Sequence, residues 1–291
     1  MASVALRLLA RAARPVVLAL LLAVPARARA QGGDTVTVEQ RVLMTPDLTA
    51  AAARRRAIDG ALAEAARQVA GVTVRSTALS TLGERNGRVT GGYASVVQLE
   101  VAARAVDYRV LWEEWETLRP AGAAPQLYLR LRLRAVIARE IGNPDPAFTA
   151  ELSLNAPRFI VRSGAQRASD ELIATVRTSH PAHLILLAIA DDSVHRLFPN
   201  EYVRARSDAA SMPVELPAPD WRERGLHLRA TLPSGVDARV ETLMLIAARS
   251  PVSPPPAATT VMALQRWLVG IPLGARAIAF TQYEVARDPP R

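Results

Sequence analysis

The sequence predicts an α+β fold with two domains, each a mainly antiparallel sheet with one or two covering helices. Residues 48–70 repeat apolar side chains along one helical face, whereas residues 127–133 alternate apolar and polar side chains as a half-buried strand does. A Gly-Asn-Pro-Asp-Pro run at residues 142–146 separates the two halves, because glycine and paired prolines continue neither element. We therefore expect an α+β docking-like domain at 31–141, a linker at 142–147 and a second α+β domain at 148–291.

The first thirty residues have the three parts of a secretory signal peptide. Arg7, Arg11 and Arg14 supply positive charge, and an apolar run at residues 16–24 follows them. This run is shorter than the roughly 20 residues that a membrane-spanning helix needs. An Ala-Arg-Ala sequence ending at Ala30 has the small residues of a cleavage site. We expect a signal peptide at 1–30, cleavage after Ala30, a periplasmic location and no membrane span afterwards; an uncleaved anchor is the alternative.

Charge and cysteine content exclude several classes of function. All 36 basic residues are arginines. Residues 1–30 contribute five of them and no acid, so the net charge falls from +9 to +4 without this segment. A charge of +4 over the remaining chain is too small to indicate a nucleic-acid-binding surface. The chain has no cysteine, which excludes disulfides and thiolate metal sites.

In the first half, a helix is expected to lie on a sheet. Asp47 stands where an N-cap is needed, Leu48 opens the helical stripe, and Gly71 ends it. The many alanines make the stripe narrow, which allows close packing on a sheet. Further β-segments are expected at residues 35–38, 72–77, 93–103 and 106–118, with a Gly-rich turn at 83–92.

A row of arginines lies on the strand at residues 127–133 and just beyond it. Side chains alternate between the two faces of a strand, so the leucines share one face and Arg130, Arg132 and Arg134 share the other. The simplest interpretation is a solvated face. The alternative is a surface that binds an anionic polymer or a protein partner.

The second half is expected to be another sheet with helices. Residues 184–190 form an uninterrupted apolar run typical of a buried strand, and Asp191-Asp192-Ser193 turns into a hairpin partner at 194–198. Residues 168–179 have the apolar spacing of a short amphipathic helix. Other expected elements are strands at 148–154, 158–161, 226–232, 243–248 and 277–285, a helix at 261–268 and a loop at 250–256.

No motif in the chain predicts an enzyme, a metal or a cofactor. The sequence contains no Gly-x-Ser-x-Gly elbow, no phosphate-binding Gly-rich loop and no His-Glu-x-x-His zinc motif. His180 and His183 have a spacing that two metal ligands can use, but Pro181 breaks a helix there and no cysteine or carboxylate cluster completes the set.

The second half resembles the bacterial family called domain of unknown function 4384. A buried strand, a turn and then Leu-Phe-Pro-Asn at residues 197–200 carry the resemblance, together with Met212-Pro213 and a Pro-Ser-Gly turn at 233–235. The segment 241–248 also fits, and the resemblance covers roughly residues 150 to 290. It departs from the family's pattern in the charged stretch 204–208. The resemblance implies an envelope location and non-enzymatic accessory work.

The first half is similar to the N-terminal domain of the periplasmic flagellar assembly protein T and related envelope lipoproteins. The similarity is carried by the Ala-rich helix at residues 53–70, the Gly-Val-Thr-Val sequence after it, and the β-segments 106–116 and 127–137. Such domains are packing and docking modules, so the similarity implies a docking role.

We therefore expect a non-enzymatic binding or assembly factor of the cell envelope, whose partner is an envelope protein or complex. The expected binding residues are Leu197, Phe198, Pro199, Asn200, Glu201 and Tyr202 of the motif and Arg130, Arg132 and Arg134 of the row. One alternative is an envelope hydrolase or wall-modifying enzyme with a dispersed site that includes Asp191, His195 and Glu201. A second alternative is capture of a small anion or a glycan in a crevice between the two halves.

Overall fold

The computed structural model describes residues 33–70, 103–119, 121–122, 124–162, 168–203, 207–208 and 212–288. The expected signal peptide at 1–30, the strand at 72–77, the turn at 83–92 and nearly all of the segment 93–103 lie outside these residues. The chain separates into Met1–Gly32 and Gly33–Arg291. All helices and strands of the described residues belong to the second unit.

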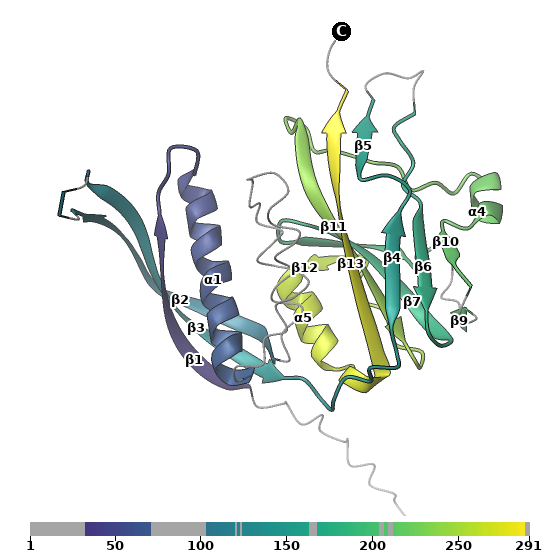
Figure 1. Ribbon diagram of the computed structural model, residues 1–291, viewed down its shortest axis with the longest axis horizontal. Helices are drawn as coiled ribbons and strands as arrows, with labels where there is room; N and C mark the ends of the chain where they lie inside the picture. Colours follow the sequence, from purple (N-terminus) through teal and green to yellow (C-terminus); the bar gives the residue numbers. More distant parts are fainter. Residues whose placement is uncertain are drawn as a thin grey trace, which may run out of the picture. The chain divides into compact units, whose positions relative to one another are not determined.

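A three-stranded antiparallel sheet covered by one helix forms the first part of this unit (Figure 1). Its strands β1 (Asp34–Leu43), β2 (Ala103–Leu118) and β3 (Gln126–Arg139) have the order β1-β3-β2. Helix α1 (Ala50–Ala70) packs on one face of the sheet, against the fully buried Leu129, Leu131 and Leu133 of β3. The predicted alternation of β3 is therefore confirmed.

Helix α1 begins two residues later than predicted. The side-chain oxygen of Thr49 accepts a hydrogen bond from the Ala52 amide at 3.2 Å, and its carbonyl accepts one from Ala53 at 2.9 Å. Thr49, and not Asp47, is therefore the N-cap. The stripe that faces the sheet consists of Ala53, Ala57, Ile58, Ala61, Leu62, Ala65, Ala66 and Val69.

A seven-stranded sheet is the centre of the second part of the unit. It contains β5 (Arg158–Val161), β7 (Ala182–Ala190), β8 (Ser193–Phe198), β11 (Ala238–Ala248), β12 (Ala258–Thr260) and β13 (Arg276–Arg287) in the order β12-β8-β7-β11-β13-β5, with β9 (Ser207–Asp208) beside β7. Its pairs are antiparallel except β13 with β5. A smaller antiparallel sheet has β4 (Ala150–Leu154), β6 (Ala174–Thr178) and β10 (Val214–Leu216) in the order β10-β6-β4. The remaining elements are α4 (Pro219–Glu223), α5 (Val261–Val269) and the 3-10 turn η2 (Leu273–Ala275).

Strand β7 is buried on both faces, which explains its uninterrupted apolar run. Leu184 and Leu186 belong to the core shared with the smaller sheet. Ile185 and Leu187 belong to the core under α5. The buried strand, the turn at Asp191-Asp192, the hairpin partner and the C-terminal helix are all confirmed.

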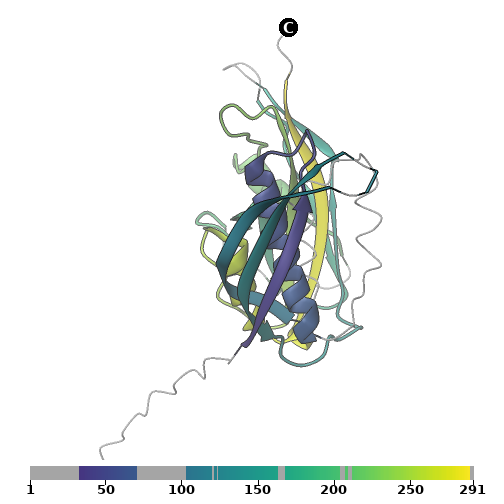
Figure 2. The same cartoon turned by 90° about the vertical axis from the view of Figure 1, so that its left-hand side faces the viewer.

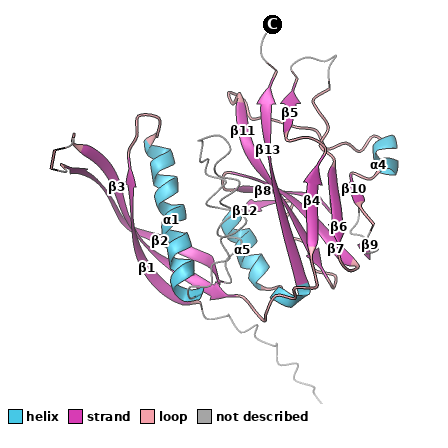
Figure 3. Ribbon diagram, viewed as in Figure 1, coloured by secondary structure: helices cyan, strands magenta, loops and turns pink. Residues whose placement is uncertain are grey.

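Two predicted elements are wrong. Residues 168–179 form no helix; their second half is strand β6, which pairs with β4 and β10 (Figure 3). Residues 226–232 form no strand beyond a single bridge between Arg229 and Glu171.

The fold is α+β, as predicted. Residues 33–291 form one compact unit, so the division into two domains stays a prediction. Several contacts join the two parts: Arg266 of α5 donates to the Val106 carbonyl of β2 at 2.6 Å, and Met262 packs on the core under α1. Figure 2 shows the β1-β3-β2 sheet in front of α1. Among the described residues, no helix is both long and apolar enough to cross a membrane.

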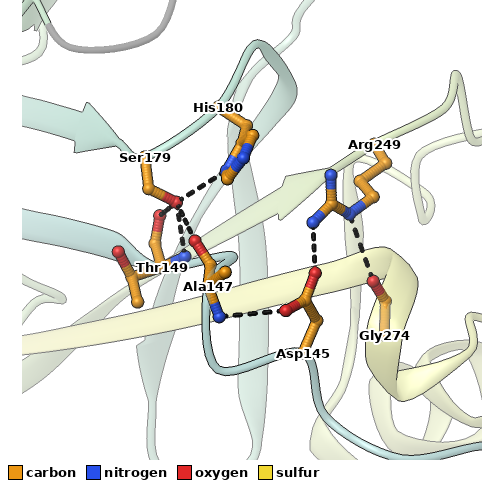
Figure 4. Close-up of polar contacts among 7 residues, drawn as sticks. All are labelled: Asp145, Ala147, Thr149, Ser179, His180, Arg249 and Gly274. Atoms are coloured by element: carbon orange, nitrogen blue, oxygen red, sulfur yellow. Dashed lines mark hydrogen bonds and ion pairs between the residues drawn. The ribbon is translucent and has the colours of Figure 1, made fainter.

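The end of the predicted linker is a hydrogen-bonded turn (Figure 4). Asp145 accepts a hydrogen bond from the Ala147 amide at 2.9 Å and forms an ion pair with Arg249. Ser179 Oγ accepts from the Thr149 amide at 2.8 Å and donates to the Ala147 carbonyl at 2.7 Å. These contacts hold residues 145–149 against the second part of the unit.

Candidate functional site

The Leu-Phe-Pro-Asn motif ends β8 in a turn that Asn200 holds closed. The Asn200 side-chain oxygen accepts hydrogen bonds from the amides of Tyr202 at 3.0 Å and Val203 at 2.8 Å. Its side-chain nitrogen donates to the Leu197 carbonyl at 3.0 Å. The asparagine thus closes the turn with its own side chain, as asparagines often do in turns.

An apolar groove of about 260 Å³ lies beside this turn; we call it the aromatic groove. One wall comes from the motif, and the other comes from the end of β10, from α4 and from the chain after α4. The Phe198 and Trp221 rings, both in its lining, stack against each other with centroids 5.6 Å apart and an interplanar angle of 26°. The lining residues are Leu197, Phe198, Asn200, Tyr202, Val203, Leu216, Pro217, Trp221, Gly225, Leu226, His227 and Leu228.

The motif residues play different parts at the groove. Leu197, Phe198, Asn200 and Tyr202 line it, whereas Pro199 is buried and Glu201 is exposed outside the lining. Tyr202 is 70% exposed, so it is open to a partner. A hydrogen bond with Glu201 raises the pKa of the Tyr202 phenol.

The second wall of the groove was not predicted. Trp221 and Leu226 come 19 and 24 residues after Tyr202, and nothing in their local sequence links them to the motif. At the edge, His227 Nδ1 lies 2.8 Å from Glu171 Oε1, so this lining histidine is held by a carboxylate.

The arginine row lies on the outer face of β3, away from α1, and on a different sheet from the groove. Arg130 forms ion pairs with Glu39 and Glu114, and its guanidinium lies 5.1 Å from the Trp112 ring centroid. Arg132 and Arg134 are exposed. The structure therefore does not unite the two groups of predicted binding residues in one site.

A second, polar cavity of about 350 Å³ opens between α1 and the β7–β8 turn; we call it the α1 crevice. Arg55 of α1 forms an ion pair of 2.6 Å with Asp191 of the turn. Arg54 is engaged by Glu113 at 2.7 Å. The lining residues are Ala51, Arg54, Arg55, Ile58, Asp59 and Leu62 of α1, Tyr108 of β2, Asp191 and Asp192 of the turn, and Val261 and Met262 of α5.

Two carboxyl groups in the α1 crevice hold their protons more tightly than usual. Burial raises the pKa of Asp59 to about 6; Arg55 opposes this shift and Asp192 adds to it. Burial likewise raises the pKa of Asp192. The cause is loss of hydration, which disfavours the charged form of a carboxyl group.

The residues of the enzyme alternative do not converge. Asp191 precedes β8, His195 lies within it and Glu201 follows it. Since a six-residue strand is about 20 Å long, Asp191 and Glu201 are at opposite ends of the strand.

Ser179, His180 and Asp145 have the residue types of a catalytic triad, but their geometry is that of a turn (Figure 4). Ser179 Oγ lies 3.1 Å from His180 Nδ1, yet the hydroxyl donates to the Ala147 carbonyl. Asp145 is bonded to the Ala147 amide and to Arg249. Within the described part of the chain, no group of three or more His, Asp or Glu side chains is placed to hold a metal ion.

Comparison with known proteins assigns the chain to no family. No protein-family model matches the chain, and no curated protein matches it. The resemblances to domain of unknown function 4384 and to flagellar assembly protein T therefore stay predictions.

Proposed function

We propose that this protein is a non-enzymatic binding or assembly factor of the bacterial cell envelope, acting in the periplasm through the aromatic groove. The observation that carries the proposal is the groove itself. The motif that was expected to bind a partner on sequence grounds forms one wall of an apolar cavity and presents an exposed tyrosine beside it. Exposed apolar concavities with a few polar groups are where proteins bind partners and ligands.

The chemistry of the groove favours an apolar side chain of a protein partner. Its lining is mostly aliphatic and aromatic, and among the described lining residues only His227 and Tyr202 have ionisable side chains. A cavity of about 260 Å³ has room for one or two large side chains. The second ring nitrogen of His227 offers a polar group at its edge, which would orient a partner's backbone. An envelope protein that inserts an aromatic or aliphatic side chain fits this arrangement.

Replacing Tyr202 with Ala is expected to reduce recovery of the partner strongly while leaving the fold intact. An interface tyrosine carries a large share of binding energy, so we expect affinity to fall by about tenfold or more. Because Tyr202 is 70% exposed, its removal takes little packing from the core. The measurement is in-cell crosslinking followed by affinity purification of the tagged protein, with the melting temperature as a check of folding.

Trp115→Ala is the matched control, because Trp115 is another exposed aromatic residue and lies on β2. It should leave partner recovery unchanged. If both variants recover the partner as the wild type does, the groove is not the binding site. If the wild-type protein is recovered as a free monomer, the assembly function itself is wrong.

A second candidate function is binding of a glycan in the α1 crevice. The cavity of about 350 Å³ has the Tyr108 ring and several charged side chains in its lining, a combination that suits a polyhydroxylated ligand. We expect N-acetylglucosamine to raise the melting temperature of the wild type in a concentration-dependent way, as any ligand of the native state does. The same titration should not shift Tyr108→Ala. A wild type that shows no shift at high sugar concentration would exclude this candidate for that sugar.

A further inference from the structure

Three arginines meet on the outer face of the β1-β3-β2 sheet. Arg132 and Arg134 are two residues apart on β3, and Arg109 of β2 lies directly opposite Arg134 in the antiparallel register. Residues directly paired in this way point to the same face. We call Arg109, Arg132 and Arg134 the guanidinium face.

These arginines differ from their neighbours in having no acidic partner among the residues that the structure describes. On the same face, Arg41 is paired with Glu116 at 3.1 Å, and Arg130 is paired with Glu39 and Glu114. Within the part of the chain that the structure describes, Arg109, Arg132 and Arg134 form no ion pair.

Two acids stand beside the guanidinium face, and neither forms an ion pair with it among the described residues. Glu39 lies opposite Arg132 in the register, but its carboxylate binds Arg130. Asp107, two residues before Arg109, accepts a hydrogen bond from the Tyr108 amide at 2.9 Å. The three positive charges are therefore concentrated at one place on the face, and two of them are directly opposed, which disfavours the isolated protein.

The spacing of Arg132 and Arg134 along β3 suits two successive groups of a linear ligand, and Arg109 adds charge beside Arg134. Side chains two apart on a strand are about 7 Å apart, and directly paired side chains are about 5 Å apart. The residue opposite Arg134 on β1 is Thr37, which is small and polar. A guanidinium forms paired hydrogen bonds with phosphate and with carboxylate.

We propose that the guanidinium face binds a linear polyanion that carries phosphate or carboxylate groups. Arg132 and Arg134 offer two successive positions along β3, and Arg109 adds a third guanidinium beside Arg134. Trp112, which lies opposite Arg132, is already in contact with the Arg130 guanidinium. This interaction is independent of the aromatic groove, which lies on the other part of the unit.

Binding of labelled polyphosphate and of labelled poly-L-glutamate tests the proposal. In the triple variant R109Q/R132Q/R134Q, we expect affinity for at least one polymer to fall by about tenfold or more at low salt. The slope of log affinity against log salt concentration should fall by roughly one unit for each arginine replaced. The melting temperature should hold or rise, because opposed like charges are removed.

The matched control is R158Q/R177Q/R224Q, which makes the same change of net charge at exposed arginines elsewhere. It should stay within about twofold of the wild type. Equal losses in both variants, or no polymer binding at low salt, would overturn the proposal. So would binding only to phosphatidylglycerol vesicles, because that ligand is a membrane and not a polymer. Partner recovery through the groove should survive in R109Q/R132Q/R134Q, which separates this proposal from the proposed function.

Discussion

Glu140→Gln is expected to lower the free energy of unfolding by about 3–5 kcal/mol, because it leaves two buried cations without their anion. Glu140 forms ion pairs with both Arg104 of β2 and Arg276 of β13. The side chains of Arg104, Glu140 and Arg276 are only 3%, 1% and 2% exposed. Burial lowers the pKa of each arginine to about 9, which shows how strongly hydration of these charges is lost.

The buried ion pairs make the stability of the protein sensitive to a loss of charge at Glu140. Glutamine keeps the shape of the glutamate, so the change removes charge and leaves packing nearly as it was. Arg276 would keep its hydrogen bond to the Ile271 carbonyl at 2.7 Å, which satisfies part of the guanidinium but none of its charge. We call Arg104, Glu140 and Arg276 the buried triad. It connects the β1-β3-β2 sheet to the seven-stranded sheet, so its loss should weaken the association of the two sheets as well as the total stability.

Urea denaturation followed by circular dichroism measures the effect. The control is Glu284→Gln, which removes an exposed ion pair with Arg158 at 3.8 Å and should cost less than about 1 kcal/mol. A loss of similar size in both variants would mean that the buried triad contributes no more than a surface pair. Two separate transitions in Glu140→Gln, against one in the wild type, would support the predicted division at residues 142–147.

Elements whose periodicity is strong and local were predictable from the sequence. The leucines of β3 alternate without interruption and all pack as expected from residue 129 onward. The apolar run in β7 predicted a buried strand. The structure explains the run, because α5 covers one face of β7 and the smaller sheet covers the other. In both strands, the pattern of apolar residues in the sequence matches the pattern of buried side chains in the structure.

Residues 168–179 show why local spacing can fail. Leu172, Ile173 and Val176 have the spacing of a helical stripe, which predicted a helix. The observed β6 pairs with β4 on one side and β10 on the other, and Val176 is buried between the sheets. Those partners are more than 15 residues away, and β-branched Thr175 and Val176 suit a strand, so tertiary pairing overrides the helical spacing.

The sites also differ in how far the sequence predicts them, depending on whether their residues are close together in the chain. The motif at 197–202 was predictable as a turn because Asn200 acts on its immediate neighbours. The groove beside it depends on Trp221, and the buried triad depends on Arg104, Glu140 and Arg276, which come from three distant segments. Residues that meet from distant segments leave no periodic pattern in the sequence, so neither the groove nor the buried triad could be predicted.

Asp59→Asn is expected to raise the free energy of unfolding at pH 7.5 by about 1–3 kcal/mol and to change it little near pH 4. The pKa of Asp59 is about 6 in the folded protein, against 3.8 for an unperturbed aspartate. As pH rises between these values, the unfolded chain releases the proton that the folded protein retains. The wild type therefore loses stability as pH rises through this window, and the loss is complete above about pH 6.

Asparagine keeps the shape of the side chain and never ionises, so it avoids the cost of a charge beside Asp192 and in the α1 crevice. Arg55, which opposes the pKa shift of Asp59, keeps its ion pair with Asp191 in the variant. The raised pKa of Asp192 leaves the variant some pH dependence of the same sign.

Urea denaturation at pH 4 and pH 7.5 measures both proteins, and Asp237→Asn is the control because its side chain is 95% exposed. The difference in stability between the two pH values should shrink in Asp59→Asn and stay as in the wild type in Asp237→Asn. A variant that is destabilised at pH 7.5 would show that the ionised carboxylate is favourable there. The attraction between the Asp59 carboxylate and Arg55 would then exceed the cost of burying that carboxylate.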